Sequence, residues 1–314
     1  MDFLISSQHI DPLYLMILGF VIGIFGGFFG VGGSFLAGPA LFAAGVPMNF
    51  VVGTDLAHIV GKSIIATRKH WALGNVDMKL GLIMATGTIG GVEIGAQVIQ
   101  YLKRRARVDM VVGVFFIVVL LFIAGFILWE SWRTIEMMRQ RDAIKRAKRM
   151  KKITGPLTKD ESAFAHIAQS IHLIKLPPMI SLPESGIKEI SLWAVLGVAL
   201  MGGIFSGFLG GGAGYIRMPS LVYILGIPTH IAVGTDLFEI IISAGYGTFT
   251  HAIKGNVDIM IALVMHTGAA IGAQIGATLT QYFAGPRIRL AFVPLPLIGA
   301  ALIIYALLTG TNLK

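Results

Sequence analysis

Long apolar runs separated by short polar segments dominate the chain. No Asp, Glu, Lys or Arg occurs within residues 12–54, 190–216 or 259–286. A helix needs about 20 apolar residues to cross roughly 30 Å of hydrocarbon, and each of these runs is longer than that. The pattern therefore predicts an all-α integral membrane protein.

Eight hydrophobic segments are expected, in two groups of four. They run at 12–44, 48–67, 79–102, 109–132, 190–225, 231–250, 259–283 and 288–309. Only 13% of the residues are charged, whereas soluble domains carry about 25%. The 40 glycines also suit membrane helices, in which neighbouring helices satisfy freed backbone groups. We expect three parts: a first transmembrane repeat (1–132), a polar basic linker (133–189) and a second transmembrane repeat (190–314).

The linker carries much of the net charge of +9. Nine Lys or Arg lie within 133–152, against the two acids Glu136 and Asp142. Such a run next to a membrane helix is typical of the cytoplasmic side, and it could also contact anionic lipid headgroups. We expect the linker to begin as a continuation of the fourth helix and then, with its four prolines, to be irregular or only partly folded.

The two groups of segments repeat one sequence pattern. Ile-Phe-Gly-Gly-Phe-Phe-Gly at 24–30 matches Ile-Phe-Ser-Gly-Phe-Leu-Gly at 204–210, and Val-Gly-Thr-Asp-Leu occurs at both 52–56 and 233–237. Pro39 and Pro219, His70 and His251, and two Gly-Asn-Val-Asp motifs follow in the same order. An internal duplication of this kind is common in transporter folds.

Each repeat opens with a hydrophobic stretch that clustered glycines interrupt. Glycine lowers helix stability by up to about 1 kcal/mol relative to Ala, so each cluster predicts an unwound point. Non-helical backbone at membrane depth is tolerated where it lines a cavity or is buried in protein. A helix that restarts there presents free N–H groups and a positive dipole end, which suit an anion. Close helix packing through small residues is the alternative reading of the same glycines.

The break leaves two topologies open. If each first stretch turns back as a re-entrant hairpin, each repeat crosses three times and the halves are inverted. If it crosses, each repeat makes four passes and the halves are parallel. The distribution of Lys and Arg favours a cytoplasmic linker only weakly, because the basic residues at 103–107 violate the positive-inside rule in both topologies.

Ionisable residues form two matching stripes inside the membrane. The second helix of the first repeat carries Asp55, His58 and Lys62 at i, i+3 and i+7, which places them on one face. The equivalent helix of the second repeat carries Asp236, Glu239 and Ser243 at the same spacing. Because charged groups at this depth cost roughly 2.5–3.5 kcal/mol each, they normally face a cavity or a partner. First-turn carboxylates stabilised by the helix dipole are the alternative for the two aspartates.

Two further charged residues are candidates. Arg217 follows the second glycine cluster, and its planar guanidinium pairs well with oxyanions; an interfacial arginine is the alternative. The first repeat has Ala37 at that position, so this role would be asymmetric. Glu93 could carry a coupling proton if it is buried.

The paired motifs resemble the TauE/SafE family of membrane permeases. Each repeat has a Gly-x-x-Gly-x-Gly-Gly-like cluster, a proline several residues later and Val-Gly-Thr-Asp-Leu, and the resemblance extends over all eight segments. It implies a duplicated helical fold and the export or uptake of sulfite, sulfonates and related sulfur-containing organic anions. The chain departs from the family in Ser34, where a third glycine is frequent, and in the length of its linker.

We therefore expect a secondary transporter, most simply an exporter, of a small anion such as sulfite or a sulfonate. An ion channel, a membrane scaffold or sensor, and an intramembrane enzyme are the alternatives. The expected substrate-binding residues are Gly30, Gly32, Gly33, Ser34, Thr54, Lys62, Gly210, Gly211, Gly212, Arg217 and Thr235. The coupling candidates are Asp55, His58, Glu93, Asp236 and Glu239.

No catalytic residue, metal or cofactor is expected, because the chain has no cysteine and no catalytic or ATP-binding motif. The expected partners are the anion, the lipid bilayer and a co-transported proton or cation, but no nucleic acid. The N-terminus lacks the basic region of a cleaved signal peptide, so we expect a multi-pass protein of the plasma or inner membrane. The sequence leaves the substrate, the transport direction, the coupling ion and the oligomeric state open.

Overall fold

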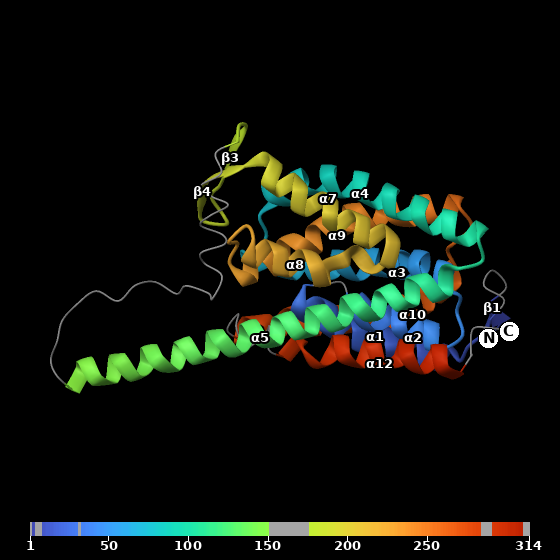
Figure 1. Cartoon of the computed structure of the whole chain (residues 1–314), viewed down its shortest axis with the longest axis horizontal. Helices are drawn as coiled ribbons and strands as arrows, with labels where there is room; N and C mark the ends of the chain where they lie inside the picture. Colours follow the sequence, from blue (N-terminus) through green and yellow to red (C-terminus); the bar gives the residue numbers. More distant parts are fainter. Residues whose placement is uncertain (1, 4–7, 31–32, 151–175, 284–290, 310–314) are drawn as a thin grey trace.

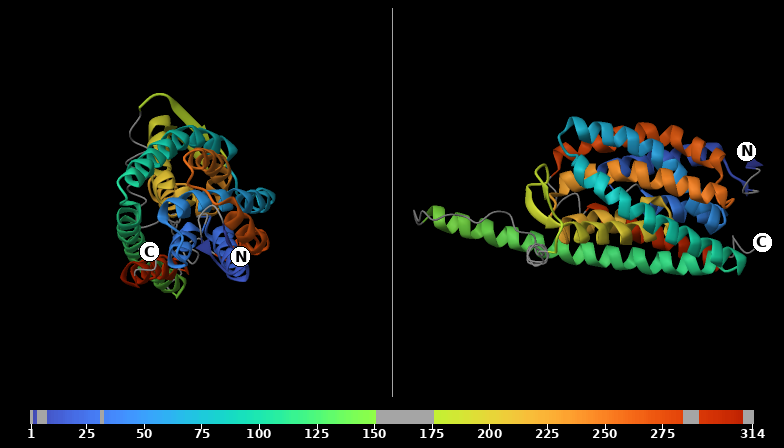
Figure 2. Two further views of the ribbon diagram at one scale, coloured as in Figure 1. Left: turned by 90° about the vertical axis from the view of Figure 1, so that its right-hand side faces the viewer. Right: turned by 90° about the horizontal axis from the view of Figure 1, so that it is seen from above.

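The computed structural model describes residues 2–3, 8–30, 33–150, 176–283 and 291–309. The helices lie side by side in an elongated bundle, beyond which one end of α5 projects (Figures 1 and 2). Six helices in the described ranges are long and apolar enough to span a membrane. The prediction of an all-α membrane protein is thereby confirmed.

The first half of the bundle consists of five helices. They are α1 (Pro12–Phe29), α2 (Ser34–Ala43), α3 (Met48–Ala72), α4 (Met78–Arg104) and α5 (Val108–Met150). A short pairing of β1 (Asp2–Phe3) with β2 (Gln8–His9) precedes them. Helix α5 continues beyond the apolar segment, as the sequence predicts.

The second half follows the same plan. It consists of α7 (Leu192–Leu209), η1 (Gly211–Ala213), α8 (Gly214–Tyr223), α9 (Thr229–Ile253), α10 (Ile259–Leu279), η2 (Thr280–Tyr282) and α12 (Pro294–Thr309). In both halves the glycine-rich stretch ends a long first helix and a shorter helix follows it.

Each short helix turns back alongside the helix before it. Gly30 has a left-handed conformation (φ 73°) that ends α1, and a Cβ atom at Gly33 would lie 2.4 Å from the side chain of Ile22, well before that end. The hydroxyl of Tyr14, near the start of α1, donates a hydrogen bond of 3.1 Å to the carbonyl oxygen of Ala40 in α2. The first stretch is therefore a helical hairpin.

Glycines hold two pairs of helices in backbone contact. Along α1, Gly19, Gly23 and Gly27 pack directly against the backbone of α10, and Gly91 and Gly95 of α4 pack against α7 in the same way. A Cβ atom at Gly23 would lie 2.5 Å from the carbonyl oxygen of Ala269, so no larger residue fits there without a shift of the backbone. Close packing through small residues, the alternative reading of the glycines, thus applies to those within the helices.

Helices α3 and α9 occupy the centre and run antiparallel. The side chain of His70, at the end of α3, lies beside Gly234 at the start of α9, whereas Gly53, near the start of α3, lies against the loop that follows α9. Both Gly-Asn-Val-Asp loops act as helix caps, since Asp77 accepts a hydrogen bond from Leu80 N and Asp258 accepts one from Met260 N. The interpretation of these loops as turns and caps is confirmed.

The end of the linker differs from the expectation. Strands β3 (Met179–Leu182) and β4 (Ile187–Ser191) form an antiparallel hairpin just before α7. The hairpin is anchored to the membrane helices, because Ser185 Oγ donates a 2.6 Å hydrogen bond to Asp77 and Lys79 Nζ donates a 2.8 Å bond to Ser181 O. The sequence did not predict these strands, and residues 151–175 of the linker lie outside the described ranges.

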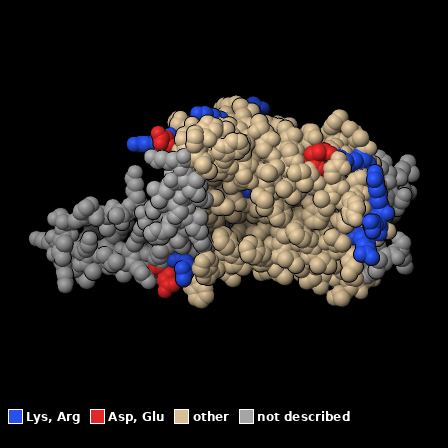
Figure 3. Space-filling view, turned by 45° about the horizontal axis from the view of Figure 1, so that its top comes forward, with Lys and Arg blue, Asp and Glu red and all other residues tan. Residues whose placement is uncertain are grey.

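Charged side chains gather toward the ends of the bundle. Figure 3 shows a broad middle region almost free of Lys, Arg, Asp and Glu, with a basic cluster at one end. Many large apolar side chains, such as Phe122 and Leu263, are exposed on the protein surface. Such a belt fits the hydrocarbon core of a bilayer.

Candidate functional site

The two polar stripes lie in the interior of the bundle. Asp55, His58 and Lys62 on α3 are at most 1% exposed, and Asp236 and Glu239 on α9 are fully buried. Burial of this kind requires partners or a ligand, because lipid and apolar side chains offer none. The stripes therefore define two clusters, which we call the α3 cluster and the α9 cluster after the helices that carry them.

The α3 cluster has few internal contacts. His58 Nδ1 lies 3.5 Å from Asp55 Oδ1, and this is the closest ion-pair contact in the cluster. Several buried polar atoms of this cluster have no hydrogen-bond partner among the described residues. They are both carboxylate oxygens of Asp55, both ring nitrogens of His58 and the Nζ atom of Lys62. The α3 cluster thus consists of polar groups that the surrounding described protein leaves unsatisfied.

Lys62 lies beside the first glycine break. A Cβ atom placed on Gly33 would be 3.1 Å from Lys62 Nζ and 2.4 Å from the side chain of Ile22, so the ammonium group lies directly beside this glycine and the position is tightly packed. Gly33 also has a left-handed conformation (φ 84°), which glycine adopts without strain. The structure therefore brings two predicted binding residues together at the start of α2.

Tyr215 of α8 joins the α3 cluster from the other half of the chain. Its side chain is fully buried, its hydroxyl has no hydrogen-bond partner in the described ranges, and it lies within electrostatic reach of Asp55. The sequence analysis missed this residue. Its position two residues before Arg217, beside a glycine break, was the available signal.

The α9 cluster is held together by one arginine. Arg217 Nε donates a short hydrogen bond to Asp236 Oδ1, and Nη2 forms an ion pair with Glu239 Oε2. Glu239 also accepts a 3.2 Å hydrogen bond from Ser243 Oγ and lies in hydrogen-bond reach of Thr88 on α4. Arg217 lies in the bundle interior, which excludes the alternative of an interfacial arginine. Its guanidinium group binds carboxylates of the protein itself.

The other glycines of the breaks make close contacts with α3 and α9. A side chain at Gly30 would meet the Cα atom of Val233 at 2.6 Å, and one at Gly210 would meet the carbonyl oxygen of Val52 at 3.0 Å. Gly211 and Gly212 are left-handed (φ 68° and 73°). Helix α2 touches η1, so the two breaks approach each other. Gly32 and the side chain of Ser34 lie outside the described residues.

The two predicted threonines bind the opposite half of the chain. Thr54 Oγ1 accepts a 2.9 Å hydrogen bond from Asp258 N, and Thr235 Oγ1 accepts a 2.8 Å bond from Asp77 N. Each hydroxyl thereby satisfies a buried backbone donor at the cap of a helix. In this arrangement both threonines hold loops in place, and their assignment to substrate binding stays a prediction.

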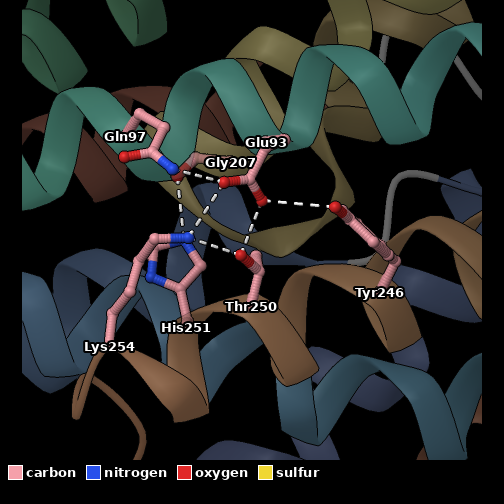
Figure 4. A network of polar contacts seen from close by, with 7 residues as sticks. All are labelled: Glu93, Gln97, Gly207, Tyr246, Thr250, His251 and Lys254. Carbon is pink, nitrogen blue, oxygen red and sulfur yellow. Dashed lines mark hydrogen bonds and ion pairs between the residues drawn. The ribbon is translucent and has the colours of Figure 1, made fainter.

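Glu93 lies apart from both clusters, between α4 and α9 (Figure 4). Its carboxylate accepts hydrogen bonds from Gln97 (2.6 Å), Thr250 (2.7 Å), Lys254 (3.1 Å) and Tyr246 (3.3 Å). The Glu93 side chain is 35% exposed. Asp236 and Glu239 share one buried cation, whereas Glu93 has Lys254 to itself and reaches the surface.

An apolar cavity of about 320 Å³ lies between α5, α7 and α8. Aromatic side chains line much of it, including Phe122, Phe126, Phe205 and Tyr223, and Tyr215 lines it as well. Tyr215 therefore stands between this cavity and the α3 cluster.

Comparisons with known proteins agree with this geometry. A family model described as "Sulfite exporter TauE/SafE" matches residues 15–303. The chain is similar to "Probable membrane transporter protein YunE" of Bacillus subtilis (strain 168), with 25% identity over 85% of this chain and 88% of the relative. It is also similar to YdhB of the same organism (21%, covering 93% and 100%) and to a probable membrane transporter protein of Methanocaldococcus jannaschii (28%, covering 64% and 74%). No solved structure matches.

Proposed function

The chain belongs to the TauE/SafE family of membrane transporters, and on that premise we propose that it is a secondary transporter of a small oxyanion, with sulfite or a sulfonate as the substrate class. Six helices that are long and apolar enough to span a membrane, and relatives named as probable membrane transporter proteins, support a multi-pass transporter. The substrate class comes from the family description, and the site must supply the chemistry for it.

One observation carries the proposal: the ammonium group of Lys62 is buried without a hydrogen-bond partner among the described residues, at the point where a glycine break turns the chain back. Asp55 on the same helix face attracts Lys62 electrostatically but does not accept a hydrogen bond from it, so the N–H donors of the ammonium group remain unsatisfied. A small oxyanion beside Lys62 would accept hydrogen bonds from them. The hydroxyl of Tyr215 and the ring of His58 offer further donors to the same ligand.

The transport experiment uses the purified chain in liposomes loaded with sulfite, with protein-free liposomes as the control. We expect saturable sulfite efflux, with competition by small sulfonates. The absence of flux for sulfite, sulfonates and other small anions would refute the proposal. Flux that rises linearly without saturation would instead indicate a channel.

We also infer that the two halves are inverted copies of one unit. The antiparallel course of α3 and α9, and the equivalent bonds from His70 to Gly27 O (3.1 Å) and from His251 to Gly207 O (3.0 Å), support this relation. Alternating access by rocking of one half against the other is the motion that such a fold permits.

The inversion can be tested by labelling, because the chain has no native cysteine. Ala72 and Ala252 are exposed at the ends of α3 and α9. In Ala72→Cys and Ala252→Cys, a membrane-impermeant maleimide should label one variant in intact cells and the other only after permeabilisation. Labelling of both from the same side would contradict the inversion.

A further inference from the structure

The α9 cluster contains more negative than positive charge. Arg217 is the one cation that contacts Asp236 and Glu239, and all three side chains are fully buried. Of the other elements packed around them, α4 contributes the hydroxyl of Thr88 and α7 contributes Gly202, against which the stem of Arg217 lies. The titratable groups of α3 that face the interior, Asp55, His58 and Lys62, belong to the other cluster. With both carboxylates ionised, the α9 cluster would therefore hold one surplus negative charge.

Unpaired atoms mark where this surplus resides. Asp236 Oδ2, Glu239 Oε1 and Arg217 Nη1 are buried without a hydrogen-bond partner among the described residues. A surplus charge in so dry a place is removed most simply by a proton, because a group in a low dielectric neutralises rather than remaining charged. One of the two carboxylates is thus expected to be an acid.

Neighbouring groups distinguish the two carboxylates. Glu239 lies 3.2 Å from the hydroxyl oxygen of Ser243, and a hydroxyl oxygen can accept a proton as well as donate one. The described hydrogen bond of Asp236 comes from Arg217 Nε, which can only donate. Glu239 is therefore the carboxylate with a neighbouring acceptor for its proton.

We propose that Glu239 is the proton-binding residue of this transporter, and that its protonation releases Arg217 to bind the transported anion. A proton on Glu239 removes the charge from its contact with Arg217 Nη2, which becomes a neutral hydrogen bond that an oxyanion can displace, while Nε keeps Asp236. The two terminal nitrogens of the guanidinium then face a planar or pyramidal oxyanion as a bidentate donor. When the anion leaves, Glu239 gives up the proton and recaptures Nη2. The inference rests on the proposed function for the identity of the anion, but the proton site itself does not.

The proton site is tested without transport, by infrared spectroscopy of the purified protein in detergent at neutral pH. The wild-type protein should show the carbonyl band of a protonated, buried carboxylic acid, and this band should shift in D₂O. The band should vanish in Glu239→Gln. It should vanish also in Asp236→Asn, because that variant leaves one carboxylate for one guanidinium. Glu93→Gln, which alters a partly exposed acid, should keep the band. Absence of the band in the wild type, or its persistence in Glu239→Gln or in Asp236→Asn, would overturn the proposal.

Coupling is tested in liposomes that contain a trapped pH indicator. For the wild type, protons and sulfite should move together. In Glu239→Gln, the number of protons moved per sulfite should fall at least tenfold, whatever the rate of sulfite flux. An unchanged ratio would overturn the role of Glu239, whereas a wild-type protein that moves no anion would count against the proposed function and leave the infrared result standing. Should Glu239→Gln fail to fold, Glu239→Asp keeps an acid at this position: a carbonyl band shifted from its wild-type frequency would assign the proton to Glu239, and an unshifted band would overturn the assignment.

Discussion

The α3 and α9 clusters occupy equivalent places in the two halves but differ in how their charges are satisfied. In the α9 cluster, Arg217 contacts both carboxylates of the stripe. In the α3 cluster, Asp55 and Lys62 have no hydrogen-bond partner among the described residues. The difference arises at three pairs of matched positions: the first half has Ala37, His58 and Lys62 where the second half has Arg217, Glu239 and Ser243.

This contrast indicates a division of labour between two halves of similar plan. A closed ion-pair network resists the entry of a ligand unless a proton loosens it. An unpaired ammonium group beside a glycine break is ready for an anion without rearrangement. Duplication therefore provides the scaffold twice, and a few substitutions along α2, α3, α8 and α9 give the copies different electrostatic roles.

The largest expected effect follows from removing the arginine. Arg217→Ala leaves two carboxylates buried without their cation, and breaking a buried pair in this way costs about 3–5 kcal/mol. Thermal unfolding in a fixed detergent should show a marked loss of stability. The double variant Arg217→Ala with Asp236→Asn should regain part of it, since the ionised carboxylate that Arg217 bound is then removed as well. Equal stability of Arg217→Ala and the wild type would show that the α9 cluster is not a closed network.

The opposite behaviour is expected for the lysine of the α3 cluster. Lys62→Met removes a buried ammonium group that has no hydrogen-bond partner among the described residues. The unfolding temperature should therefore stay unchanged or rise. Hydrogen bonds to charged groups contribute about 1.5–3 kcal/mol, so sulfite affinity should fall about 10-fold to 100-fold. The matched control is Lys79→Met, because Lys79 binds Ser181 O at the hairpin, away from both clusters. If Lys62→Met lost stability but kept its affinity for sulfite, Lys62 would have a structural role and would not bind the anion.

Much of this architecture can be predicted from the sequence because it is encoded locally. Clustered glycines mark the breaks at 30–33 and 210–212, the spacing of Asp55, His58 and Lys62 sets one helix face, and Asp77 and Asp258 mark helix starts. Each of these signals acts within a few residues of chain, as propensity, periodicity or capping.

The partners of the site residues could not be predicted in this way. Arg217 meets Glu239 across the loop between α8 and α9, and Thr54 bonds to Asp258, which lies in the other half of the chain. Tyr215 reaches Asp55 only because α8 turns back toward α3. Such contacts depend on the direction of each helix, and the sequence left that direction open between two topologies.

The threonines test whether the two halves remain equivalent outside the clusters. Thr54→Val and Thr235→Val each remove the acceptor of one buried backbone N–H, which costs about 1–3 kcal/mol. The two losses of stability should be similar, because the hydrogen bonds are equivalent and differ by only 0.1 Å in length. Thermal unfolding of both variants checks this. A large loss in one half alone would show that the asymmetry of the clusters extends into the scaffold.

The smallest effect is expected at Glu93, the acid that the sequence offers as a coupling candidate and the structure places elsewhere. Its ion pair with Lys254 is partly exposed, and pairs of this kind contribute about 0–1 kcal/mol. Thr250, Gln97 and Tyr246 also bind the carboxylate, and the isosteric amide of Glu93→Gln can keep some of these bonds. Stability should therefore change little, and the number of protons moved per sulfite should match the wild type. The opposite result would be that Glu93→Gln uncouples proton movement from anion movement while Glu239→Gln does not. The proton path would then run along the α4–α9 surface. The contrast between the two buried clusters would not be the basis of coupling.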